Sequence, residues 1–141
     1  IAPDYPNSLV ICADTIVAID HKILGKPKDE QDATRIIELL SGRKHQVLTG
    51  VFLKYKDEQK VFVEETTVEF VKLEANEISE YVATPEPYDK AGGYAIQGLF
   101  SKYVKSIEGD YYNVMGLPIS RLYQEIKRLE RKYQISISTK K

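Results

Sequence analysis

The chain has 141 residues, of which 43% are hydrophobic and 29% are charged, and its formal net charge at pH 7 is -1. This composition is typical of one globular domain, so we expect residues 1–141 to form a single domain. It excludes the basic surface that nucleic-acid partners require, and no apolar run approaches the roughly 20 residues of a membrane span. The single Cys12 excludes an internal disulfide and is typical of the reducing cytoplasm, and one cysteine with two histidines excludes a zinc site built from such ligands.

A carboxylate interrupts the first predicted strand, which covers residues 9–19. Asp14 stands between the apolar blocks LVICA and IVAI, and burying an unpartnered carboxylate costs several kcal/mol. We therefore predict that Asp14 lies at a strand end or bulge and faces a polar cleft. Residues 9–19 form either one strand or two strand halves around Asp14. The segment IDHKIL then predicts a turn into a short second strand.

A helix and a β-hairpin are predicted next. Asp29 is the expected N-cap of a helix that ends near Gly42, since apolar residues recur there at helical spacing. The segments HQVLTGVFLKYK and KVFVEETTVEFVKL alternate apolar and polar residues, and the intervening DEQ indicates an antiparallel hairpin. We interpret His21 and His45 as loop or strand-edge residues.

The second half of the chain predicts two further helices. The segment ANEISEYVA is a short helix that TPEP stops, YDKAGGYAIQG is a glycine-rich loop, FSKYVKSIEG is a strand and DYYNVMGLP is a loop. Pro118 fits the first turn of a final helix, and the tail ISISTKK is a strand or a frayed end. The elements together predict an α/β or α+β architecture around one sheet. The apolar face of the final helix is predicted to contain Ile119, Leu122, Ile126, Leu129 and Tyr133.

Polar side chains stand at the ends of three apolar segments, where loops usually carry binding sites. Lysines neutralise phosphate oxygens, a carboxylate can hold Mg²⁺ or orient water, and an amide can read the edge of a base. The set therefore fits a polyphosphate ester with a divalent metal. Its members are Asp14, Thr15, Lys26, Asp89, Lys90 and Gln97.

Each of these residues also has a plainer interpretation. Lys26 and Lys90 taken singly are more often exposed surface charges. Gly92 and Gly93 either let backbone N–H groups approach a ligand or form a turn without one. Gln97 alone is more often a satisfied residue at a strand end.

Five segments occur in the order and spacing of the Maf family of septum-formation nucleotide pyrophosphatases, which this chain resembles from Leu9 to about Ile126. The segments are ADTIV, LGKP, LSGRKHQVLTGV, ISEYVATPEPYDKAGGYAIQG and GDYYNVMGLP. The resemblance implies an α/β fold like that of inosine-triphosphate pyrophosphatases, with a central mixed sheet flanked by helices and a cleft between two lobes. It also implies hydrolysis of a nucleoside triphosphate to the monophosphate and pyrophosphate. The form DKAGGYAIQG resembles the branch that acts on dTTP and UTP, whether normal or modified nucleotides, and not the branch that acts on 7-methyl-GTP.

The resemblance also implies roles for individual residues. Asp14 corresponds to the proposed proton acceptor and would hold the divalent metal, Mg²⁺ or Mn²⁺. Thr15 and Gln97 correspond to positions linked to substrate choice. Lys26 and the Asp89–Lys90 pair would lie near the triphosphate. Because relatives are often dimers, a homodimer is expected.

The chain departs from the family pattern at its start. The Ser-x-x-Arg-Arg/Lys loop of the family, and the functional Glu and Lys that follow it, cannot be placed in this sequence. We therefore expect an N-terminally truncated domain that has an exposed sheet edge and, tested alone, is weak or inactive. The alternative function is a non-catalytic nucleotide-binding regulator of septum formation and cell division.

Overall fold

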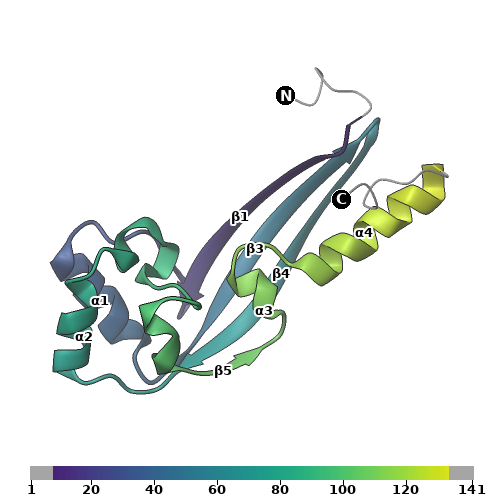
Figure 1. The fold of residues 1–141 in the computed structure, drawn as a ribbon. Helices are drawn as coiled ribbons and strands as arrows, with labels where there is room; N and C mark the ends of the chain where they lie inside the picture. The colour runs from purple at the N-terminus through teal and green to yellow at the C-terminus, as the bar shows by residue number, and fades with distance from the viewer. Residues whose placement is uncertain (1–7, 134–141) are drawn as a thin grey trace.

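The computed structural model describes residues 8–133 and shows an elongated sheet with helices at both ends (Figure 1). The order of the five strands is β2-β1-β3-β4-β5. Every pairing among the described residues is antiparallel. This differs from the mixed sheet that the resemblance implied. The α/β class is confirmed. The strands are β1 (Val10–Ile19), β2 (Lys22–Leu24), β3 (Lys44–Tyr55), β4 (Glu58–Phe70) and β5 (Val104–Glu108).

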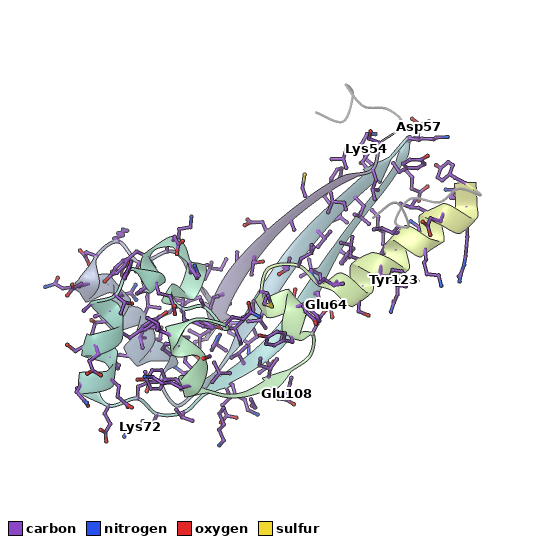
Figure 2. All side chains as sticks on the ribbon, viewed as in Figure 1. Lys54, Asp57, Glu64, Lys72, Glu108 and Tyr123 are labelled. Atoms are coloured by element: carbon purple, nitrogen blue, oxygen red, sulfur yellow. The ribbon has the colours of Figure 1, made fainter. Side chains whose placement is uncertain are left out.

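The long hairpin of β3 and β4 forms the centre of the sheet. Its strands pair without interruption from Lys44↔Glu69 to Tyr55↔Glu58, so the connecting turn is shorter than the predicted DEQ segment. Alternate residues of β3 are buried, as period-2 patterning predicts. Figure 2 shows the hairpin tip, marked by Asp57, at the opposite end of the molecule from Lys72.

Two short helices cover the end of the sheet that lies far from the hairpin tip (Figure 1). Helix α1 (Glu30–Leu40) begins at the predicted N-cap, where the Asp29 carboxylate accepts a hydrogen bond of 2.8 Å from the Asp32 N–H. Helix α2 (Ala75–Val82) begins with a capping box between Glu74 and Glu77. Their apolar faces join the sheet in one core, whose members include Ala33, Ile36, Ile37, Leu40, Val47, Val68, Phe70, Ile78 and Phe100.

Helix α4 (Ile119–Tyr133) lies along the other part of the sheet (Figure 1). Its buried residues Leu122 and Ile126 pack in a second core with Val51, Leu53 and Phe62. The predicted apolar face is confirmed except at Ile119, which is exposed. Because the two cores are separate clusters, the long strands connect two lobes. The tail ISISTKK lies outside the described residues.

Three local predictions were wrong. The segment DYYNVMGLP contains a short helix, α3 (Tyr111–Val114), because the Asp110 carboxylate accepts hydrogen bonds from two backbone N–H groups and caps it. The segment FSKYVKSIEG begins in a 3₁₀ helix, η4 (Leu99–Tyr103), and only its second half is strand β5. His45 is fully buried and is not an edge residue.

One edge of the sheet is open beside the first half of β1. Strand β2 pairs only with Val17, Ala18 and Ile19, so within the described residues positions 10–16 have no neighbouring strand on that side. The Asp14 side chain, in this part of β1, is exposed.

Candidate active site

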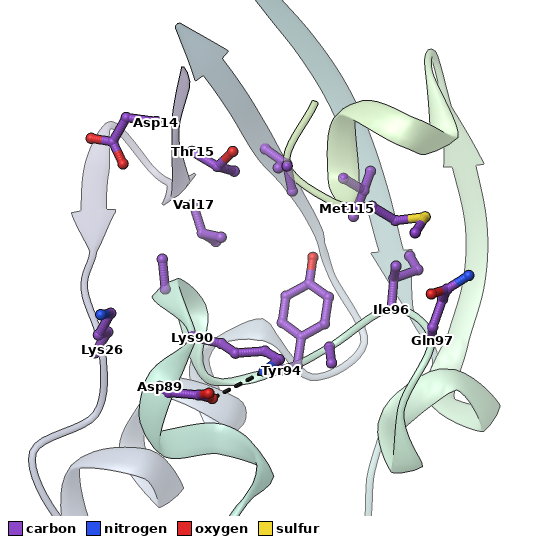
Figure 3. A pocket seen from close by; sticks show the side chains of 15 residues that line it. Asp14, Thr15, Val17, Lys26, Asp89, Lys90, Tyr94, Ile96, Gln97 and Met115 are labelled. Atoms are coloured by element: carbon purple, nitrogen blue, oxygen red, sulfur yellow. Dashed lines mark hydrogen bonds and ion pairs between the residues drawn. The ribbon is translucent and has the colours of Figure 1, made fainter. Parts of the chain in front are cut away.

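All six predicted site residues line one cavity of about 430 Å³. This volume lies within the range of small-molecule sites in proteins. Figure 3 shows Asp14 and Lys26 on one side of the opening, Gln97 and Met115 on the other, and the ring of Tyr94 between them. The cavity therefore brings together side chains from strand β1, the segment after β2, and the glycine-rich loop.

Asp14 and Thr15 reach the cavity from opposite faces of the same strand. They are consecutive residues of β1, paired with Gly50 and Thr49, so their side chains alternate across the sheet. Both nevertheless line the cavity. The prediction of a strand end or bulge was wrong, since Asp14 lies within a regular strand, where its side chain is exposed and its carboxylate stays hydrated.

Gly92 fastens the glycine-rich loop to both neighbouring segments. Its N–H donates to the Gly25 carbonyl at 3.1 Å, which connects the loop to the LGKP segment. Its φ is +75°, and a Cβ there would lie 2.9 Å from both Cγ atoms of Val17 in β1. Only glycine fits this close contact, which holds Lys26 and Lys90 on the same cavity.

The N–H groups of the two adjacent glycines bond to the protein itself. The Gly93 N–H donates to the Lys90 carbonyl at 3.0 Å, just as the Gly92 N–H donates to Gly25. Both glycines are buried. The structure therefore supports the interpretation of this pair as a turn.

An ion pair lies at the mouth of the cavity. The Lys90 ammonium donates to the Asp89 carboxylate at 3.0 Å, as the dashed line in Figure 3 marks. This hydrogen bond lowers the pKa of Asp89, and the charges of Lys90 and Lys26 lower it further. Asp89 therefore stays ionised and offsets part of the positive charge of the two lysines.

Tyr94, which lines the cavity, belongs to a buried pair with His45 that sequence patterns did not reveal. The Tyr94 hydroxyl lies 2.7 Å from His45 Nε2, and both side chains pack edge to face against Phe70. Burial lowers the pKa of His45 to about 4 and raises that of Tyr94. Both groups are thus neutral near pH 7 and act as a rigid floor for the site.

Helix α3 supplies the wall opposite the lysines. The buried Asn113 side chain donates to the Val47 carbonyl at 3.1 Å and the Glu64 carbonyl at 3.0 Å, on two adjacent strands. This anchor positions Met115 and Gly116, which line the cavity. No sequence pattern indicated this anchor, because an asparagine in a loop is ordinarily a turn residue.

The carboxylates of the cavity fit a hard cation only in part. Within the described ranges, no group of three or more His, Cys, Asp or Glu side chains could enclose a metal ion. Mg²⁺, however, typically uses one or two carboxylates together with water and substrate phosphates. Asp14 is suited to such an open site because its carboxylate is exposed at the edge of the cavity.

Comparison with known proteins identifies the family of this chain. Residues 1–129 match the family described as Maf-like protein. The chain belongs to the Maf family. Maf relatives include proteins named dTTP/UTP pyrophosphatase from Geobacillus sp. (strain WCH70), at 53% identity over 92% of this chain and 69% of the relative, and from Koribacter versatilis (strain Ellin345), at 51% identity over 91% and 66%. A third, from Bacillus cytotoxicus, is 49% identical over 92% and 68%, so this Maf chain spans about two thirds of the length of these relatives.

Glu86 is a residue of this Maf domain whose importance was not predicted. It lies in the 3₁₀ helix η2 (Glu86–Asp89), and its carboxylate accepts hydrogen bonds from the Tyr81 hydroxyl and the Leu99 N–H, both at 2.8 Å, and from the Phe100 N–H at 3.3 Å. It therefore caps η4 directly after the segment that carries Gln97. The sequence has a glycine, Gly98, at the position that faces this carboxylate. In the structure a Cβ there would lie 2.1 Å from Glu86 Oε1.

Among the parts of the Maf chain that the structure describes, no helix has the length and apolar character needed to cross a bilayer.

Proposed function

We propose that this chain is part of a nucleoside triphosphate pyrophosphatase that hydrolyses dTTP and UTP, or modified pyrimidine nucleotides, to the monophosphate and pyrophosphate. The observation that carries the proposal is the convergence of Asp14, Lys26, Lys90 and Gln97 on one cavity in a chain of the Maf family. The names of relatives about half identical to it support the substrate class.

The side chains of the cavity divide the chemistry between them. Asp14 accepts the proton of a water molecule that adds to phosphorus in the α–β link, the bridging P–O bond breaks, and pyrophosphate leaves with the bridging oxygen. Lys26 and Lys90 balance phosphate charge, with Lys90 exchanging the Asp89 carboxylate for a phosphate oxygen. Catalysis of this type depends mainly on positioning and charge stabilisation.

Asp14 would also be the ligand through which the protein holds a divalent cation, Mg²⁺ or Mn²⁺. Such an ion, when bound, neutralises phosphate charge and polarises the phosphoryl group. Gln97 and Thr15 lie on the side of the cavity formed with Met115 and Gly116, where they would contact the base.

The proposal is tested by pyrophosphate release from dTTP, UTP, CTP, ATP and 7-methyl-GTP with Mg²⁺ or Mn²⁺, in the full-length protein. We expect dTTP and UTP to be the preferred substrates and Asp14→Asn to lower kcat about a hundredfold or more. Asp57→Asn in the hairpin turn is the matched control and should match wild type. Survival of both substrates would refute the proposal, and tight binding without turnover would favour the nucleotide-binding regulator.

The lysines give a second test of the same site. Loss of one preorganised positive group costs roughly 2–4 kcal/mol of transition-state stabilisation, about a hundredfold in kcat/KM. We expect this loss in Lys26→Ala and in Lys90→Ala, whereas Lys28→Ala, exposed and outside the cavity, keeps wild-type activity. Equal activity in all three variants would place the two cavity lysines on an ordinary solvated surface.

Assembly and location remain predictions. We propose a homodimer, which sedimentation would detect, and a single-domain organisation. The single cysteine among 141 residues is consistent with a reducing cytoplasm.

A further inference from the structure

The charged side chains that line the cavity cancel one another. Two are lysines, Lys26 and Lys90, and two are aspartates, Asp14 and Asp89, so the lining that the described residues form has no net charge. A triphosphate carries several negative charges, and a site that attracts such an anion is expected to have positive charges in excess. Asp14 has a role in the proposed reaction as proton acceptor and metal ligand. Asp89 has no such role, so its presence in the cavity needs another explanation.

The surroundings of Asp89 do not indicate a structural role. Its side chain is 76% exposed and accepts a hydrogen bond of 3.0 Å from the adjacent Lys90. By contrast, the carboxylates of Asp29 and Asp110 each cap the start of a helix. An exposed ion pair contributes at most about 1 kcal/mol to stability. The Asp89 carboxylate can therefore separate from Lys90 at little cost to the fold.

Asp89 lies among the lysines that are expected to hold phosphate groups. The hydrogen bond from Lys90 lowers the pKa of Asp89 most, and the charge of Lys26 lowers it further, so both ammonium groups act on this carboxylate. In Figure 3 the two lysines lie on either side of it. A carboxylate and a phosphate oxygen are both anionic acceptors and compete for the same ammonium hydrogens. The chain thus supplies these lysines with an anion of its own.

We propose that Asp89 is an internal counter-ion that competes with phosphate groups for Lys90, so that it weakens the binding of polyphosphates and eases the release of pyrophosphate. This inference rests on the proposed function, and it gives Asp89 the opposite effect from a residue that assists binding. Holding substrate and transition state equally tightly does not raise kcat. Pyrophosphate, which lacks the nucleoside, keeps only the phosphate contacts, and these are the contacts that Asp89 weakens.

The test measures binding of inorganic tripolyphosphate and of pyrophosphate to the full-length protein by isothermal titration. The titrations contain EDTA, so a role of Asp89 as a metal ligand cannot change the result. In Asp89→Asn the competing charge is lost, and we expect both Kd values to fall about tenfold. Asp89→Glu keeps the charge and should stay within about threefold of wild type. An unchanged or higher Kd in Asp89→Asn, or no detectable binding to either protein, would overturn the inference.

Asp57→Asn is the matched control, because it makes the same substitution at an exposed position of the hairpin turn, outside the cavity. It should keep the wild-type Kd for both anions. An equal fall in Kd in Asp57→Asn would show an effect of the net charge of the protein and would overturn the inference.

A double-mutant cycle separates competition for Lys90 from a general effect of charge on the site. In wild type Lys90 has to leave the carboxylate before it binds a phosphate oxygen, whereas in Asp89→Asn it does not. We therefore expect Lys90→Ala to raise the Kd of tripolyphosphate by a larger factor in the Asp89→Asn background than in wild type. Equal factors in the two backgrounds would overturn the inference.

Product inhibition gives a second readout. The Ki of pyrophosphate against dTTP hydrolysis should fall about tenfold in Asp89→Asn, in line with the change in Kd. A large fall in kcat with an unchanged Ki would assign Asp89 to the chemistry and overturn the inference, while leaving the proposed function in place. Absence of pyrophosphate release from dTTP and UTP in the wild type would refute the proposed function and, with it, the role in product release.

Discussion

Glu86 offers the sharpest test of how this site is held together. Its carboxylate accepts three hydrogen bonds that connect helix α2, through Tyr81, to the first turn of η4, through Leu99 and Phe100. Glu86→Ala removes all three acceptor contacts and leaves two N–H groups without their partner. Gln97, one residue from Gly98 in the same loop, should lose its fixed position.

The size of the effect can be worked out from these contacts. A hydrogen bond contributes about 1 kcal/mol net, and more when one partner is charged, so three bonds to a half-buried carboxylate correspond to about 3 kcal/mol. In a chain of this size each kcal/mol shifts Tm by roughly 3–5 °C, so we expect Tm to fall by about 10 °C. Tyr81→Phe removes one bond and should lose about a third as much.

Thermal and urea unfolding measure the stability, and calorimetric titration with the α,β-methylene analogue of UTP, which cannot be cleaved between the α and β phosphates, measures binding. Glu80→Ala is the matched control, since it makes the same charge change at an exposed position of helix α2. Its free energy of unfolding should stay within about 0.5 kcal/mol of wild type. If Glu86→Ala unfolds like Glu80→Ala, then the carboxylate does not cap η4. Unchanged affinity in a destabilised variant would show that Gln97 does not depend on this cap.

Two further predictions concern stability. Burial lowers the pKa of His45 from 6.5 to about 4, so the unfolded chain takes up a proton before the folded chain does as the pH falls. The free energy of unfolding should therefore decrease by up to about 3 kcal/mol between pH 6.5 and pH 4. Urea unfolding at several pH values should show this slope, and His45→Gln should reduce it; identical slopes would contradict the assignment. Gly92→Ala should cost 3 kcal/mol or more, roughly, through overlap with Val17 and a strained φ, whereas Gly42→Ala, with φ +68° but no atom closer than 3.5 Å, should cost about 1 kcal/mol. Equal costs in urea unfolding would show that the overlap relaxes.

The local signals of the sequence determined much of the fold. The Asp29 cap, the strict alternation along β3 and the apolar face of α4 each depend on residues close together in the chain, and each is present in the structure. The six side chains that the sequence predicted to lie together also line one cavity. Patterns of this kind predict elements because helix and strand spacing act over a few residues.

Contacts between distant residues decided the rest. Asp14 is exposed within a regular strand and not at a bulge, and the N–H groups of Gly92 and Gly93 bond to the carbonyls of Gly25 and Lys90. The burial of His45, the cap formed by Glu86 and the anchor formed by Asn113 each depend on a partner at least 12 residues away in the chain. A sequence states which donors and acceptors exist, but only the folded chain decides which of them meet, and burial makes those pairings costly to leave unmade.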